Sequence, residues 1–131
     1  MSVVDASAYV DVVVGLAPVA GPAVNALTGR IDAPAIFPAE VMSGLRGLLV
    51  AGHISDRAAA EASTNLTSAR IQLHPFLPYA KRVWDLRANL TVYDAWYVAI
   101  AEALGQPLVT GDRAILRAPG IRCPVIDARS S

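Results

Sequence analysis

Four acidic residues stand where a folded chain could use them for chemistry. Asp5 and Asp112 each follow a short apolar run typical of a strand, whereas Glu40 and Asp94 stand near the starts of two apolar segments typical of helices. Each acid alone has an ordinary explanation, because acids are common after strands and favourable in the first turn of a helix. Four carboxylates in one crevice, however, would repel one another unless a cation offset their charge.

The residue types predict which cation that would be. Carboxylate and water oxygens are the ligands preferred by hard divalent ions such as Mg²⁺ and Mn²⁺. The side chains that bind softer metals are isolated in the sequence: His53, His74 and Cys123 have no partner nearby, and we expect them to be structural. The acids therefore predict a magnesium or manganese site.

The other polar residues near these four acids, and the remaining acids, all have ordinary structural explanations. Ser7 and Thr110 lie two residues from Asp5 and Asp112, where a hydroxyl can orient a ligand, although helix capping and strand propensity explain them equally well. Glu102 lies about 80° round the helix from Asp94, and we treat it as structural. The remaining aspartates are expected to be surface or capping residues: Asp11, Asp32, Asp56, Asp85 and Asp127.

The elements that must position the acids alternate along the chain. Short apolar, β-rich runs predict five strands, at residues 3–4, 31–33, 70–76, 107–112 and 123–127, the second of them broken by Pro34. Helical patterns separate them, including one over residues 79–90 and one capped by Thr91 and closed by Gly105. This order predicts an α/β domain with a mostly parallel sheet. Such sheets bind ligands outside the carboxyl ends of their strands, where Asp5 and Asp112 would emerge.

Length and composition favour one soluble domain. The chain has 131 residues, of which 54% are hydrophobic and 17% charged, so we expect a single domain over residues 1–131, with disorder limited to residues 127–131. The single cysteine excludes an intrachain disulfide and fits a reducing compartment. No signal peptide is evident and no apolar run reaches the roughly 18 residues of a membrane span, so a cytoplasmic location is expected.

The formal net charge of zero hides an uneven distribution. The first 69 residues hold six acidic and three basic residues, and the remainder hold five and eight. This sorting fits either solvated helix faces or a phosphate-binding surface in the second half.

Four segments resemble one known family, the PIN-domain ribonucleases, and within it the VapC-type toxins of bacterial toxin–antitoxin modules. They are VVDASA (residues 3–8), FPAEV (37–41), LTVYDAWYVAIAEALGQPLVTGD (90–112) and the closing PVID. The third is the most specific, because its motifs follow one another in a fixed order, and the resemblance covers nearly the whole chain. It implies a three-layer PIN-like sandwich with a central sheet of about five mostly parallel strands, flanked by helices.

The resemblance also implies an activity and a site. The family's acidic quartet falls on Asp5, Glu40, Asp94 and Asp112, which would bind one or two Mg²⁺ or Mn²⁺ ions for the hydrolysis of RNA. Family members often choose structured RNAs such as tRNA. Thr110 and Ser7 match the small polar residues that accompany the quartet. Gly111 departs from the family, which often has alanine there, and we expect little consequence. Arginines of the second half would contact substrate phosphates: Arg113, nearest the site in sequence, and Arg82, Arg87 and Arg117.

Partners follow from the same resemblance. It implies a homodimer and a cognate VapB-type antitoxin whose C-terminal segment lies in an apolar groove and blocks the site. The apolar helices at residues 10–16 and 41–50 are candidates to line that groove, although core packing explains most of their side chains.

Three other functions were compared with this one. A catalytically silent PIN-like RNA- or protein-binding module is the alternative, but it would be expected to have lost some of the acids. A phosphoacceptor signalling domain needs a lysine after its last strand, and the only lysine, Lys81, precedes the helix of Asp94. A dinucleotide-binding domain is disfavoured because no G-x-G-x-x-G follows the first strand.

Overall fold

The protein folds around a parallel five-stranded sheet, as the sequence predicts. The structure, a computed structural model, describes residues 1–15 and 18–129. The strands are β1 (Ser2–Val4), β2 (Ile31–Pro34), β3 (Ile71–His74), β4 (Leu108–Thr110) and β5 (Val125–Asp127), and each pairs in parallel with its neighbours in the order β3-β2-β1-β4-β5. The chain thus builds outward from β1 in one direction and then returns to build from β4 in the other.

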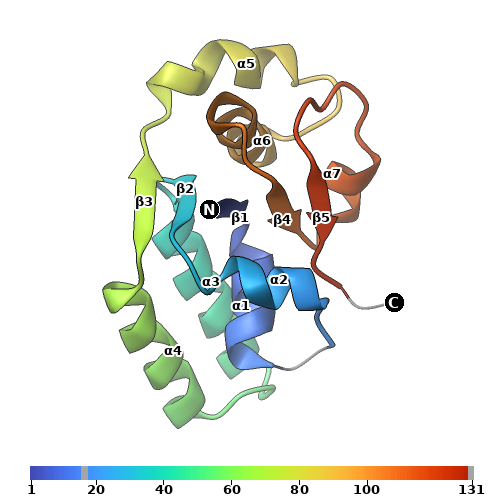
Figure 1. Ribbon diagram of the computed structural model, residues 1–131. Helices are drawn as coiled ribbons and strands as arrows, with labels where there is room; N and C mark the ends of the chain where they lie inside the picture. The colour runs from blue at the N-terminus through green and yellow to red at the C-terminus, as the bar shows by residue number, and fades with distance from the viewer. Residues whose placement is uncertain (16–17, 130–131) are drawn as a thin grey trace.

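Helices cover both faces of this sheet (Figure 1). In that view α5 (Ala80–Asp85) and α6 (Val92–Leu104) lie above the strands. Below them lie α1 (Ala6–Val14), α2 (Gly21–Ala26), α3 (Phe37–Val50) and α4 (Asp56–Ser68), and the short α7 (Arg113–Arg117) flanks β5. The result is the expected three-layer sandwich.

Burial on both faces explains why the central strands are so apolar. Val3, Val4, Leu108 and Val109 are fully buried, as expected for parallel strands covered on both sides. Helix α6 packs against β1, β2 and β4, and its residues 95–101 are all buried. Most of α6 after Asp94 and all of β4 before Asp112 are therefore core, which places the two acids at the ends of packed elements.

The predicted caps are confirmed where local chemistry sets them. The Thr91 hydroxyl accepts from Asp94 N at 3.2 Å, and Gly105 ends α6 with a φ of 64°. The Ser55 hydroxyl, a side chain of the type that favours helix starts, accepts from Ala58 N at the start of α4. These ends depend only on neighbouring residues, which explains why the sequence predicts them well.

Three boundaries differ from the prediction. The helix expected over residues 79–90 ends at Asp85, because Leu86 and Leu90 reach the core from a following turn rather than from a helix. It is preceded by a 3₁₀ turn, η1 (Leu77–Tyr79). Pro34 does not break β2 but ends it, paired with His74. Helix α7 was not predicted, since five residues carry too little periodicity.

The C-terminal segment is also more ordered than expected. Asp127 ends β5, Ala128 is buried, and Arg129 forms an antiparallel bridge with Val19. The expectation of disorder is therefore wrong for residues 127–129, while residues 130–131 lie outside the described part of the chain. Among the described residues, no helix is both long and apolar enough to cross a membrane.

Candidate active site

The acidic residues meet where the strand order of the sheet reverses. Strands β1 and β4 are neighbours, although β2 and β3 separate them in the sequence. Their carboxyl ends lie side by side, because Val4 is in register with Val109. Asp5 and Asp112 leave these two ends, at the switch point where open α/β sheets bind their ligands.

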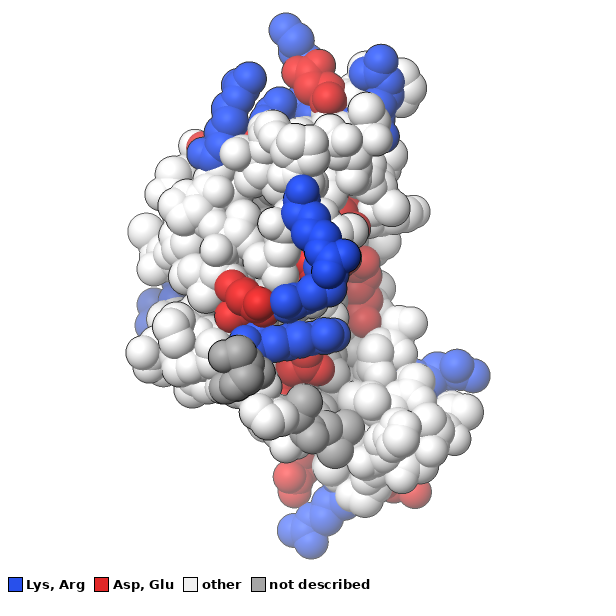
Figure 2. Space-filling view, turned by 90° about the vertical axis from the view of Figure 1, so that its right-hand side faces the viewer, with Lys and Arg blue, Asp and Glu red and all other residues white. Residues whose placement is uncertain are grey.

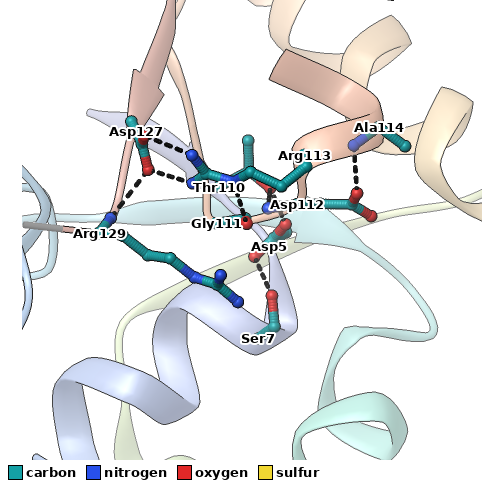
Figure 3. A network of polar contacts seen from close by, with 9 residues as sticks. All are labelled: Asp5, Ser7, Thr110, Gly111, Asp112, Arg113, Ala114, Asp127 and Arg129. Carbon is teal, nitrogen blue, oxygen red and sulfur yellow. Dashed lines mark hydrogen bonds and ion pairs between the residues drawn. The ribbon is translucent and has the colours of Figure 1, made fainter. Parts of the chain in front are cut away.

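Asp5 is held by three hydrogen bonds, of which Figure 3 shows those from Ser7 and Thr110. Its Oδ1 accepts from Ala8 N at 2.8 Å, which caps α1, and from the Ser7 hydroxyl at 3.1 Å, while its Oδ2 accepts from the Thr110 hydroxyl. Burial raises the pKa of Asp5, the three hydrogen bonds act against that rise, and the charge of Asp112 adds to it. The carboxylate is therefore fixed in place but short of positive charge.

Thr110 connects Asp5 to Asp112. Its hydroxyl is fully buried, donates to Asp5 and accepts from Asp112 N at 3.0 Å. The Asp112 carboxylate in turn caps α7 by accepting from Ala114 N at 2.8 Å. The predicted supporting positions of Ser7 and Thr110 are thus occupied by hydroxyls that contact the carboxylate of Asp5.

Asp94 approaches the same point from α6. It lies in the first turn of that helix, and its pKa is raised to about 6. Burial is the largest cause, followed by the negative charge of Asp112 and, more weakly, that of Asp5. Asp94 therefore lies close enough to the other two acids to feel their charge.

Glu40 reaches the site from α3 and is oriented by a tyrosine. The Tyr97 hydroxyl, on α6, donates to Glu40 Oε1 at 2.7 Å. Burial and this bond to an acceptor carboxylate both raise the pKa of Tyr97, so it stays protonated and continues to donate. Sequence analysis missed Tyr97, although it lies three residues after Asp94 and hence on the same side of α6.

All four acids line one cavity of about 430 Å³. Its wall also contains Asp11, which had been expected to be an ordinary surface residue. The spacing of Asp11, four residues after Ser7 on α1, is the signal that could have identified it. The rest of the wall is lined by Ala6, Ser7, Val10, Gly44, Leu48 and Tyr97.

The chemistry of this cavity fits a hard divalent cation. Its charged groups are carboxylates, and none of the arginines predicted to bind phosphate lines it. Among the described residues, no three acidic, histidine or cysteine side chains already converge at metal-binding distance. The acids share a cavity and repel one another, so a cation would have to draw them together.

The predicted phosphate-binding arginines divide into two groups. Arg113 lies beside the site, where its guanidinium donates to Gly111 O and to both oxygens of Asp127 at 2.8 and 2.5 Å. Asp127 is therefore an ion-pair partner, and its pKa falls to about 2 because of Arg113. Arg117 follows in the last turn of α7 and is exposed.

Arg82 and Arg87 do not join this group. Arg82 binds Glu102 near the far end of α6, with Nε to Oε1 at 2.6 Å and Nη2 to Oε2 at 3.1 Å. Arg87 lies over the ring of Trp84, 4.5 Å from its centroid. Arg82 is therefore held by an ion pair with Glu102, and neither arginine lines the acidic cavity.

A second buried acid was misjudged from the sequence. Asp32 was expected at the surface, yet it is fully buried in β2. Its Oδ1 accepts from Arg30 at 3.0 Å and lies 2.9 Å from His74 Nε2. Burial alone would raise the pKa of Asp32, but these partners bring it below the ordinary value. His74, predicted to be structural, is thus the partner of a buried acid.

Comparison with known proteins agrees with this geometry. The sequence matches the PIN domain family over residues 2–121. It is 40% identical to ribonuclease VapC1 of Mycobacterium tuberculosis, and the match covers 94% of each chain. It is 38% identical to ribonuclease VapC12 of the same organism, and that match covers 92% of this chain and 93% of the relative. Its fold is similar to that of a toxin–antitoxin complex from Klebsiella pneumoniae, with a TM-score of 0.64, 20% identity and 96% of each chain covered.

Proposed function

The chain belongs to the PIN-domain family, and we propose that it is a metal-dependent endoribonuclease, the toxin of a VapBC-type toxin–antitoxin module. The observation that supports this most strongly is the cavity at the β1–β4 switch point: Asp5, Glu40, Asp94 and Asp112 line it, and no basic side chain of the described residues does. Relatives named ribonucleases match along nearly the whole chain.

We propose that the cavity binds one or two Mg²⁺ or Mn²⁺ ions. Asp5, Asp94 and Asp112 would hold the metal directly or through water, because they reach the same cavity from the ends of β1 and β4 and from the first turn of α6. A bound divalent cation supplies a water of lowered pKa as nucleophile and neutralises charge that develops on the phosphoryl group. Whether Mg²⁺ or Mn²⁺ is bound depends on properties of the occupied site.

The remaining residues of the site orient and hold protons. Tyr97 keeps its proton and directs it at Glu40, so that the free oxygen of Glu40 is left to accept from an attacking water or to bind a second ion. Ser7 and Thr110 keep the Asp5 carboxylate in one orientation. Arg113, fixed by Asp127, presents a positive charge beside the site to a substrate phosphate.

We propose that a VapB-type antitoxin blocks this cavity. Its wall continues from the acids onto Val10 of α1 and onto Gly44 and Leu48 of α3. Gly44 allows α1 and α3 to approach closely, since a Cβ there would lie 3.4 Å from Val10 Cγ2. An apolar peptide segment that ends in a cation would suit this groove, with its charge among the acids. Leu16, also predicted to line the groove, lies outside the described residues.

We also propose that the toxin is a homodimer. Exposed apolar side chains such as Val50, Leu77 and Trp84 are the kind of surface that a second copy would cover. Light scattering after size exclusion, with and without the antitoxin, measures both assemblies. A monomer at micromolar concentration would contradict the dimer and leave the nuclease proposal intact.

RNA cleavage by the metal-supplemented protein tests the nuclease proposal. We expect cleavage with Mg²⁺ or Mn²⁺ that EDTA abolishes, and a loss of more than about 100-fold in Asp5→Asn or Asp94→Asn, since even residues that only support metal ligands typically contribute 10–100-fold. Asp85→Asn removes an exposed acid from α5 and is the control. Cleavage unaffected by the first two changes would contradict the assignment, and no cleavage by the wild type would favour a silent binding module.

A further inference from the structure

The segment after β5 is fastened beside the candidate active site. Ala128 N donates to Thr110 O at 2.9 Å, and Ala128 O accepts from Ala20 N at 2.9 Å. Arg129 N donates to Asp127 Oδ1 at 2.9 Å, and its backbone bridges to Val19. Three independent attachments therefore fix where the side chain of Arg129 starts, next to the strand that carries Thr110.

From there the side chain of Arg129 passes over Gly111. A Cβ on Gly111 would lie 3.4 Å from Arg129 Nε and 3.6 Å from its Cγ, so the missing side chain of this buried glycine provides the path. Figure 3 shows the arginine running past Gly111 toward α1. The structure thus gives Gly111, between Thr110 and Asp112, a packing role that its sequence position did not indicate.

The guanidinium of Arg129 starts beside Gly111, the residue before Asp112, and Asp112 lines the acidic cavity. Burial raises the pKa of Asp11, which lines that cavity, and the positive charge of Arg129 acts against the rise. Figure 2, which views the molecule from the side of β5, shows basic and acidic side chains next to one another at the centre of this face. The arginine charge is therefore close enough to the cavity to act on a ligand that enters it.

Arg129 differs from its neighbour Arg113 in having unused donors. Both guanidinium ends of Arg113 are occupied by Asp127. Across residues 1–15 and 18–129, the guanidinium of Arg129 forms neither a hydrogen bond nor an ion pair. A planar guanidinium with free N–H groups is well suited to bind phosphate oxygens.

We propose that Arg129 is a substrate-binding residue that holds a phosphate of the RNA strand at the rim of the acidic cavity, along the path left open by Gly111. The inference rests on the proposed nuclease function. Arg113 supplies a fixed positive field, and Arg129 supplies the donors that contact the strand. A cation at this rim also offsets the repulsion between the RNA backbone and the acids of the cavity.

Steady-state cleavage of a short single-stranded RNA in Mn²⁺ tests this role. We expect Arg129→Ala to raise KM about tenfold and to leave kcat within about twofold, since phosphate contacts contribute mainly to binding. The slope of log(kcat/KM) against log salt should become shallower by about 0.7, the value for one phosphate of a single strand. Arg57→Ala on α4, which removes one exposed positive charge elsewhere, is the matched control and should change neither quantity.

A double-mutant cycle tests the path over Gly111. Gly111→Val fills the space that Arg129 occupies, so it should raise KM in the wild-type background and have no further effect on Arg129→Ala. An equal effect in both backgrounds would overturn the role of Gly111. Arg129→Lys, which keeps the charge and loses the planar fork, should fall between the wild type and Arg129→Ala.

Two results separate the possible failures. If the wild type cleaves RNA and Arg129→Ala matches Arg57→Ala in KM and in salt slope, or lowers KM, the substrate-binding role is overturned and Arg129 only balances Asp11. If the wild type cleaves no RNA in Mg²⁺ or Mn²⁺, the proposed function fails and this inference fails with it. Thermal unfolding of each variant confirms that the compared proteins are folded.

Discussion

The two ends of helix α6 hold acidic residues in opposite ways. At its start, Asp94 lies beside Asp112 and Asp5, and its pKa is raised to about 6. Near its end, Glu102 accepts from Arg82 Nε at 2.6 Å and from Arg122 N at 2.6 Å. Burial would raise the pKa of Glu102 as well, but these donors bring it below the ordinary value.

The difference separates acids that pair with a cationic side chain of the protein from acids that accept only from neutral donors. The structural acids receive cations from the chain itself: Glu102 pairs with Arg82, Asp127 with Arg113, and the buried Asp32 with Arg30. Within residues 1–15 and 18–129, Asp5, Glu40 and Asp112 accept from hydroxyl and amide donors and from no cationic side chain. A bound metal ion would supply positive charge to these acids, which is the physical basis for proposing one there.

The largest effect on stability is expected at the end of α6 that carries Glu102. Arg82→Ala removes the ion-pair partner of Glu102 and also the donor to Gly120 O. Loss of one partner of a buried ion pair typically costs 3–5 kcal/mol, and because the side chain of Arg82 is 23% exposed we expect about 3 kcal/mol. Urea unfolding measures it. The stabilisation of the protein by Mn²⁺ should be unchanged, and a change would mean that the two ends of α6 are coupled.

A smaller loss is expected where the cavity depends on a hydroxyl. Thr110→Val keeps the shape of a buried side chain but removes the donor to Asp5 and the acceptor for Asp112 N. An unsatisfied buried group costs about 1–3 kcal/mol, and support for a metal ligand is typically worth 10–100-fold in activity. Unfolding and RNA cleavage measure the two effects. Thr110→Ser is the control, and wild-type cleavage by Thr110→Val would contradict the supporting role.

The smallest expected effect on stability is a gain rather than a loss. Asp94→Asn removes one of the repelling charges, so we expect the metal-free protein to gain about 1 kcal/mol at neutral pH, after allowance for solvent screening of a half-buried group. The pKa of Asp94 is about 6 in the folded protein, against an ordinary value of 3.8, so the folded protein binds this proton more tightly than the unfolded chain does. The wild type therefore loses stability as pH rises from about 4 to about 6.

The pH dependence provides the check. The gain from Asp94→Asn should be absent near pH 4, grow up to about pH 6 and then stay constant, when unfolding is measured in EDTA. Loss of stability in Asp94→Asn at neutral pH would show that Asp94 is a structural acid like Glu102, and the comparison between the two ends of α6 would fail.

The sequence predicted the elements and the four acids because local rules and strand order determine them. Apolar runs marked the five strands, Thr91 and Gly105 marked the ends of α6, and parallel strands with a common edge brought Asp5 and Asp112 together. These features need no knowledge of how distant side chains meet.

What the sequence missed depends on contacts between distant parts of the chain. Asp32 is satisfied by His74, which is 42 residues away, and Arg82 was assigned to the substrate although Glu102 binds it. Arg129 gained its position from its bridge to Val19 and from the hydrogen bond that the preceding Ala128 donates to Thr110 O. Charge sorting alone could not distinguish an arginine that pairs with an acid from one that is free to bind a phosphate.

Direct titration of the protein with Mn²⁺ tests the central claim, that the acids of the cavity bind a divalent cation. Isothermal calorimetry at pH 7.5 should show one or two ions bound to the wild type and to Arg82→Ala, and none to the Asp5→Asn/Asp94→Asn double variant. Equal binding by the double variant and the wild type would contradict the account.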